Sequence, residues 1–202
     1  TMRIRSKLFA IIGTLSLVVG AVAGIGVASL ETLSRAADDM QAASTRALYG
    51  ERLNRVVTAV VMDSRGVYAA TDTRDAKRYA DPLVASLRDM NALLQRWEPR
   101  VLPEQRPLFE RVKEGAAAFT ALRTETARLG VEVSPKAAAE QGFNEANRAN
   151  RRAYQESIDA LTATDIKAVE ALSAALDATH TERLKWLSAV AVLGVVVSLV
   201  AG

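Results

Sequence analysis

The sequence predicts an all-α protein, an antiparallel up-down four-helix bundle between two transmembrane helices. Half of the 202 residues are apolar but only 5% are aromatic, a mixture that suits helices packed side by side better than a sheet. Only five prolines and eleven glycines interrupt the chain, which favours a few long helices. Between two strongly apolar segments, apolar residues recur every three or four positions, as the helical period requires.

The first apolar segment covers residues 8–30 and follows a short basic N-terminus, residues 1–7. It contains no charge, and a helix of this length spans roughly 34 Å, enough to cross a hydrocarbon core. Gly20 and Gly24 share one face of such a helix, where small residues allow another helix to approach. The other interpretation is a cleaved signal peptide with a small-residue cleavage site at residues 21–23.

The second apolar segment covers residues 184–202. We expect it to be a second transmembrane helix, truncated by the end of the chain, with Lys185 and Trp186 as interfacial anchors. The basic residues at positions 3, 5 and 7 predict a cytoplasmic N-terminus by the positive-inside rule. Residues 31–183 are then expected to form a periplasmic domain of a protein in the bacterial inner membrane.

Two helices are predicted in the first half of residues 31–183. The first continues the membrane segment and keeps its apolar period as far as Tyr68. Asp72 or Thr73 is the candidate N-cap of the second helix, which runs to Trp97. Pro82 predicts either a kink in this second helix or its true start.

Two more helices are predicted after a proline-rich turn at residues 98–107. The third begins near Leu108 and runs to about Leu129, with Gly130 as its candidate C-cap. The fourth is expected to begin near Lys136 and to continue without a break to the second membrane segment. Short loops between such helices predict an antiparallel bundle.

A candidate ligand-binding site follows from comparing how far residues of the first and fourth helices lie from the membrane. Arg65 and the region around Asn150 are expected at the same level, roughly 50 Å above the membrane. A guanidinium offers a planar fork of donors for a carboxylate, and Gly66 would allow a ligand or a partner backbone to approach closely. We therefore expect a small-molecule ligand, with a carboxylate as the candidate class. The predicted ligand-binding residues are Arg65, Tyr68, Thr71, Asn147, Arg148 and Arg151.

A structural interpretation of the same residues is also open. Arg65 would then pair with Asp72 or Asp63. The asparagines of the fourth helix would specify the register of a dimer. The arginines at positions 148, 151 and 152 would form a solvated face.

Composition argues against several other classes of function. All 23 acidic residues and 22 of the 26 basic residues lie within 31–183, so the chain has no one-signed surface that would attract nucleic acid. With no cysteine and one histidine, His180, a metal site is not expected. No catalytic or phosphate-binding motif occurs, so we expect neither an enzyme nor a cofactor.

The order of these segments resembles the sensory half of a bacterial methyl-accepting chemotaxis protein. At residue level, the stretch from "MDSRGVYAA" to "KRYADPL", residues 62–83, is similar to the first-to-second-helix segments of chemoreceptors with four-helix-bundle sensor domains. Arg65 matches the position at which the aspartate-receptor type has its ligand-binding arginines. The multiple-arginine pattern of that type is absent from the first helix, so the resemblance does not imply an amino-acid ligand.

The resemblance implies a function in chemotaxis, as a transmembrane transducer without catalytic activity. It implies a homodimer that detects a periplasmic stimulus and shifts its second membrane helix, acting through a cytoplasmic adaptor on a histidine kinase. Two alternatives remain open from the sequence. The first is that the chain is the sensor half of a membrane histidine kinase or nucleotide cyclase. The second is that it is a bundle that senses a binding protein or the state of the membrane.

Overall fold

The computed structural model describes residues 4–201, and every regular element in this range is a helix. This confirms the predicted all-α class. The chain divides into two compact units, a bundle unit of residues 43–167 and a second unit of residues 1–42 with 168–202. The α-helices are α1 (Ile4–Ala69), α2 (Thr73–Trp97), α3 (Arg106–Glu132), α4 (Pro135–Gly142) and α5 (Glu145–Ala201), with short 3₁₀ turns η1 (Glu98–Arg100) and η2 (Pro103–Gln105) between α2 and α3.

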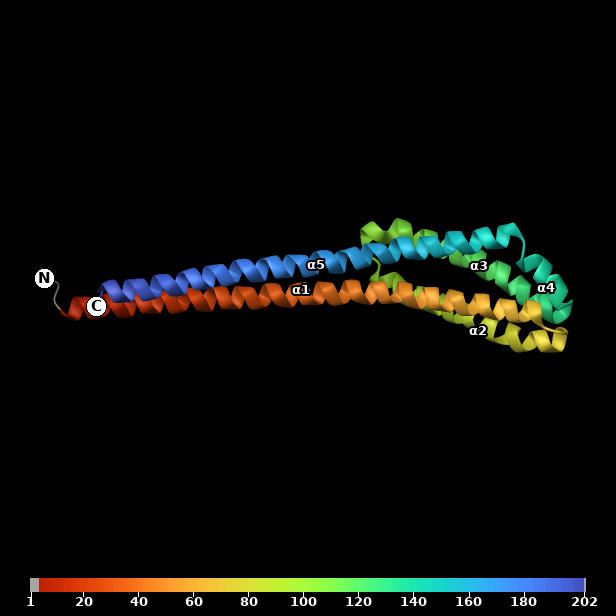
Figure 1. Ribbon diagram of the computed structural model, residues 1–202, viewed down its shortest axis with the longest axis horizontal. Coiled ribbons are helices and arrows are strands. Elements are labelled where there is room, and N and C mark those ends of the chain that lie inside the picture. The colour runs from red at the N-terminus through yellow and green to blue at the C-terminus, as the bar shows by residue number, and fades with distance from the viewer. Residues whose placement is uncertain (1–3, 202) are drawn as a thin grey trace. The chain divides into compact units, whose positions relative to one another are not determined.

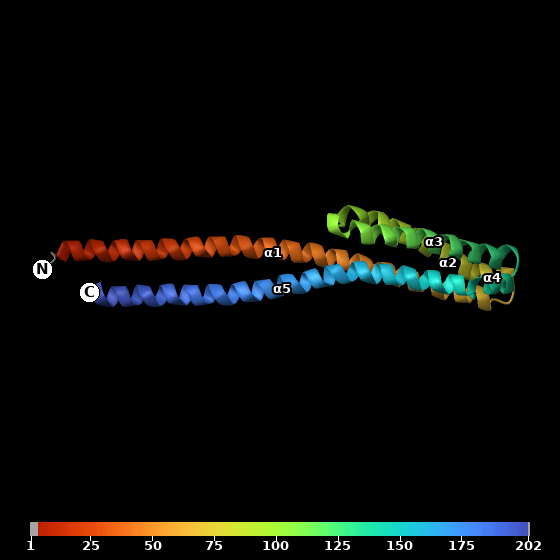
Figure 2. The same cartoon turned by 90° about the horizontal axis from the view of Figure 1, so that it is seen from above.

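The bundle unit is a four-helix bundle in which parts of α1 and α5 pack with the α2–α3 hairpin (Figures 1 and 2). Each helix contributes one buried face, as its apolar period predicts. Large side chains fill the core, and their burial supplies most of the driving force for folding. The largest buried ones include Leu53 and Val57 from α1, Leu83, Met90 and Trp97 from α2, Phe109 and Phe119 from α3, and Tyr154 and Ile158 from α5.

The start of α2 agrees with the prediction from the sequence. Asp72 is its N-cap and accepts a hydrogen bond from the backbone N–H of Asp75 at 2.8 Å. This bond satisfies one of the N–H groups that have no partner within the helix. Pro82 lies inside α2, which continues through it to Trp97, so Pro82 does not mark the start of the helix.

Two predicted helix boundaries are wrong. Gly130 does not end α3, which continues to Glu132; instead, the position of its missing Cβ is occupied by Val67 of α1. The predicted fourth helix is in fact two helices, because the helical conformation ends at Gly142 and begins again at Glu145. Asn144 then starts α5 by accepting a hydrogen bond from the backbone N–H of Asn147 at 2.8 Å.

Gly66 has a packing role within the bundle. The aromatic ring of Tyr79 from α2 lies where a Cβ at position 66 would be. The ring can therefore approach the α1 backbone directly. The glycine that weakens the helix locally is the residue that lets α1 and α2 pack closely.

A buried ion pair joins α1 to α5 at the end of the bundle unit where α2 turns into α3. Arg46 Nε lies 2.7 Å from Asp165 Oδ1, and both residues are buried. Gln105 of η2 donates from Nε2 to the same oxygen at 2.8 Å, and its Oε1 accepts from the backbone N–H of Leu102 at 3.2 Å. Charges buried in this way stabilise a fold only when they are paired and hydrogen-bonded.

The second unit consists of the first part of α1 and the last part of α5. Arg183 donates to Thr32 Oγ1 at 3.1 Å and joins the two helices. Within the described part of the chain, the Leu15–Ala69 stretch of α1 holds a segment long and apolar enough to cross a membrane, none of it buried. The predicted crossing at 184–202 ends in residues 197–202, whose side chains lie outside the described part, so it stays a prediction.

We expect Asp165→Ala to lower the free energy of unfolding by about 3 kcal/mol, because it leaves the Arg46 guanidinium buried without its partner. Chemical denaturation followed by circular dichroism measures this loss. Asp81→Ala is the control, because its ion pair with Lys77 is exposed. Equal stabilities of the two variants would contradict the role given to the buried pair.

We expect Gly66→Ala to cost about 1–3 kcal/mol, because the added Cβ meets the ring of Tyr79. A double-mutant cycle isolates this contact. In a Tyr79→Ala background the same substitution should cost nothing or stabilise the helix. If the cost is the same in both backgrounds, the contact does not explain the glycine.

Candidate ligand-binding site

Two of the six predicted site residues line one groove of the bundle unit. Arg65 of α1 and Arg151 of α5 face it together with Gln155, and its volume is about 180 Å³. The remaining wall comes from α1: Val57, Thr58, Val61 and Met62. The groove thus has an apolar floor on α1 and a guanidinium on each of two helices.

In the part of the chain that the structure describes, neither arginine of this groove is neutralised by an acid. Among residues 4–201, Arg65 and Arg151 form no ion pair; Arg151 donates only to the neutral Gln155, from Nε to Oε1 at 3.2 Å. Neither of the two acids expected to pair with Arg65, Asp72 and Asp63, forms an ion pair with it among the described residues. Asp72 caps α2, and the half-buried Asp63 has its pKa raised by desolvation. The groove therefore presents positive charge without a counter-ion.

Tyr68 faces a residue that the sequence analysis passed over, Arg123 of α3. The Arg123 Nη1 atom donates to the phenol oxygen of Tyr68 at 3.0 Å, and its guanidinium lies over the ring of Phe119. Arg123 is only 5% exposed, and burial lowers the pKa of its guanidinium, which the positive charge of Arg151 lowers further. Arg123 nevertheless stays protonated at neutral pH.

A signal for Arg123 is present in the sequence. It lies four residues after Phe119 and three before Thr126, which places it on the buried face of α3. An arginine at such a position requires either a counter-ion or a ligand. Leu122, one residue away, continues the apolar period of α3 equally well, so this signal is ambiguous in the sequence.

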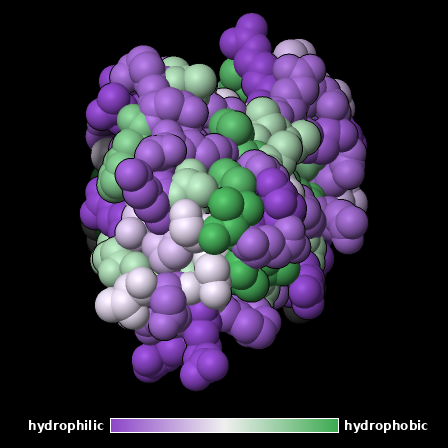
Figure 3. Space-filling view, turned by 90° about the vertical axis from the view of Figure 1, so that its right-hand side faces the viewer, coloured by the Kyte–Doolittle hydropathy of each residue, from purple (hydrophilic) through white to green (hydrophobic). Residues whose placement is uncertain are grey.

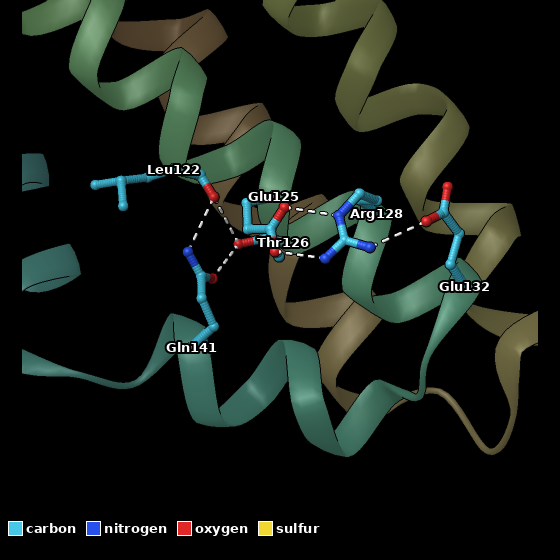
Figure 4. Close-up of polar contacts among 6 residues, drawn as sticks. All are labelled: Leu122, Glu125, Thr126, Arg128, Glu132 and Gln141. Atoms are coloured by element: carbon cyan, nitrogen blue, oxygen red, sulfur yellow. Dashed lines mark hydrogen bonds and ion pairs between the residues drawn. The ribbon is translucent and has the colours of Figure 1, made fainter.

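Asn147 is fully buried beside the joint between α4 and α5. Its Nδ2 donates to the backbone oxygen of Gln141 at 3.4 Å, and its Oδ1 has no partner among the described residues. Gln141 in turn fixes α4 on α3. Its side chain accepts from Thr126 Oγ1 at 2.7 Å and donates to the backbone oxygen of Leu122 at 3.1 Å (Figure 4).

Thr71 and Arg148 do not reach the groove. Thr71 is exposed beyond the end of α1, where its backbone N–H donates to Asp75 Oδ2 at 3.2 Å. Arg148 is exposed and lies 3.3 Å from Glu145, measured from Nε to Oε2. The structure thus brings Arg65 and Arg151 together, links Tyr68 to Arg123, and leaves Thr71 and Arg148 apart from them.

The arginines of this region have the chemistry that suits the binding of an anion. The α1, α3 and α5 helices each contribute one arginine, and among the described residues none of the three pairs with a carboxylate. In the same part of the chain, no group of three or more His, Cys, Asp or Glu residues is placed to hold a metal ion. Clustered guanidinium groups are typical of sites for carboxylates and phosphates.

We expect Gln141→Ala to release α4 from α3, because it removes the hydrogen bonds to Thr126 and Leu122. The cost should be about 1 kcal/mol, and amide hydrogen exchange across residues 135–142 should become faster. Glu140→Ala is the control, since Glu140 is exposed. Unchanged exchange in the Gln141 variant would mean that this network does not hold α4.

The family that matches this sequence has the same kind of fold as the structure, a four-helix bundle. Residues 1–180 match the family described as a four-helix-bundle sensory module for signal transduction. No curated protein and no solved structure matches the chain. Because the match covers most of the sequence, the chain belongs to the family of four-helix-bundle sensory modules that act in signal transduction.

Proposed function

We propose that this chain is the sensory part of a transmembrane chemoreceptor of the methyl-accepting type, and that its stimulus is a small anion, a carboxylate being the expected class. Its membership of the sensory-module family supports the sensor role. The acid-free pair of Arg65 and Arg151 supports the ligand class. The module has no catalytic activity of its own in this proposal.

The proposal includes a place in the cell and a set of partners. The chain forms a homodimer in the bacterial inner membrane, with its N-terminus in the cytoplasm and the bundle unit in the periplasm. The apolar first part of α1 and the basic residues before it support this orientation. Signals leave through the second membrane segment to a cytoplasmic adaptor and a histidine kinase.

The position of the groove supports a mechanism for the signal. Arg65 belongs to α1 and Arg151 to α5, the two helices that continue beyond the bundle unit. A carboxylate that pairs one oxygen with each arginine favours one register of α1 against α5. A ligand can shift a conformational equilibrium only by its difference in affinity for the two states, typically about 1–3 kcal/mol.

We expect thermal unfolding of the full chain in lipid nanodiscs to shift upward with a carboxylate ligand but not with the corresponding neutral amide. A ligand at a hundred times its dissociation constant stabilises the protein by about 2.7 kcal/mol. The panel contains aliphatic and aromatic mono- and dicarboxylates, each with its amide. Arg65→Ala and Arg151→Ala should abolish the shift.

Arg148→Ala is the matched control for this experiment. It removes the same charge from the same helix as Arg151→Ala, but from an exposed ion pair outside the groove. The shift should survive in this variant. A panel without any anion-specific shift, or a shift that all three variants retain, would contradict the proposed function.

A further inference from the structure

The bundle unit contains two buried arginines in opposite situations. Arg46 is 7% exposed and pairs with Asp165 at 2.7 Å, and Gln105 donates to the same carboxylate oxygen. Arg123 is 5% exposed but has no carboxylate partner among residues 4–201, and its Nε atom has no hydrogen-bond partner. A buried charge without a counter-ion is costly, so the position of Arg123 calls for an anion that is not part of the described chain.

The surroundings of Arg123 are polar but incompletely paired. On the facing stretches of α3 and α5, four more buried side-chain atoms lack a hydrogen-bond partner within the described range: Thr120 Oγ1, Asn147 Oδ1, Asn150 Oδ1 and Tyr154 Oη. Native proteins keep few such atoms, and a cluster of them indicates a ligand or bound water. Asn150 and Tyr154 also line a groove of about 410 Å³ between α3 and α5.

The only side-chain hydrogen bond of Arg123 within the described range goes to a neutral phenol, Tyr68. The phenol hydroxyl lies against Gly142, where a Cβ would otherwise be, and the Tyr68 ring lies 5.0 Å from that of Phe143, centroid to centroid. Phe143 is 60% exposed and sits in the break between α4 and α5. Tyr68 and Phe143 together form what we call the aromatic cover of Arg123.

The aromatic cover lies toward the end of the bundle unit at which α1 ends. The end face is mostly hydrophilic, with hydrophobic side chains gathered near its middle (Figure 3). Phe143 presents an aromatic ring to Tyr68, so a ligand group that takes the place of the Tyr68 ring must be flat and apolar to pack on it. It must also carry a carboxylate at one end, because the guanidinium then gains the negative partner that a phenol does not supply.

We propose that Arg123 anchors an aromatic carboxylate inside the subunit, with the ligand ring taking the place of Tyr68 against Phe143 and its carboxylate bound to the guanidinium. The inference rests on the proposed function for its signalling role and specifies the ligand of the same arginine cluster. In this proposal Arg123 makes the buried contact, while Arg65 and Arg151 line the groove described above. Charge-assisted, two-pronged pairing of this kind is among the strongest hydrogen bonds that proteins form.

Titration of the full chain in lipid nanodiscs with benzoate tests the proposal, by calorimetry and by thermal unfolding. Benzamide keeps the ring without the charge, and acetate keeps the charge without the ring, so both should bind at least tenfold more weakly. Arg123→Met should abolish benzoate binding. Without ligand, this variant should unfold at the same temperature as the parent chain or higher, because it removes an unpaired buried charge.

Tyr68→Phe keeps the test decisive even if Arg123→Met does not fold. It removes only the hydroxyl that competes for the guanidinium, so benzoate should bind several-fold more tightly. A merely structural role of the Tyr68–Arg123 bond predicts the opposite, a less stable protein without a gain in affinity. Arg128→Met is the matched control, because it removes the same charge from the same helix but from exposed ion pairs with Glu125 and Glu132, and it should leave benzoate affinity unchanged.

The outcomes separate this inference from the proposed function. Loss of benzoate binding in Arg123→Met, or tighter binding in Tyr68→Phe, supports the inference. Carboxylate binding that depends on Arg65 and Arg151 but is unchanged in both the Arg123 and Tyr68 variants overturns the inference and leaves the proposed function in place. Absence of binding by benzoate and by every other carboxylate overturns both.

Discussion

The buried pair of Arg46 and Asp165 sets the register on which the rest of the bundle unit depends. It joins α1 to α5, and Gln105 attaches the turn between α2 and α3 to the same carboxylate. A slip of either long helix would separate the two charges in the core, at a cost of several kcal/mol. The register that this pair fixes also brings Arg65 and Arg151 to the same groove, about five turns away along α1 and about four turns away along α5.

The two buried arginines, Arg46 and Arg123, differ in what they contribute: Arg46 stabilises the fold, whereas the surroundings of Arg123 suit the binding of a ligand. Arg46 has its counter-ion within the chain, because Asp165 and the amide of Gln105 that bonds to the same carboxylate oxygen are both part of it. Arg123 contacts a phenol and an aromatic face, and no carboxylate of the described residues pairs with it. Stability alone does not account for a residue of this kind, since an apolar side chain of similar size would pack there at lower cost. Natural proteins accept such local costs mainly at functional sites.

Much of the fold could be predicted from the sequence because helical period and capping are local signals. The all-α class and the Asp72 cap followed from them, whereas the ligand-binding role expected of Arg65 stays a prediction. The break before Asn144 and the burial of Arg123 depend on contacts between distant segments, which periodicity does not contain. Because Leu122 fits the apolar period of α3 as well as its neighbour Arg123 does, the period alone does not show that Arg123 is the buried one.

The contact between Tyr68 and Gly142 has a consequence for related sequences. Since the phenol fills the space of a Cβ at position 142, the two positions are sterically coupled. Relatives with a larger residue at 142 should carry a smaller one at 68, and such relatives would lack the cover over Arg123. Covariation between these two columns of an alignment would then divide the family into members with a closed and members with an open arginine, without any structure being solved.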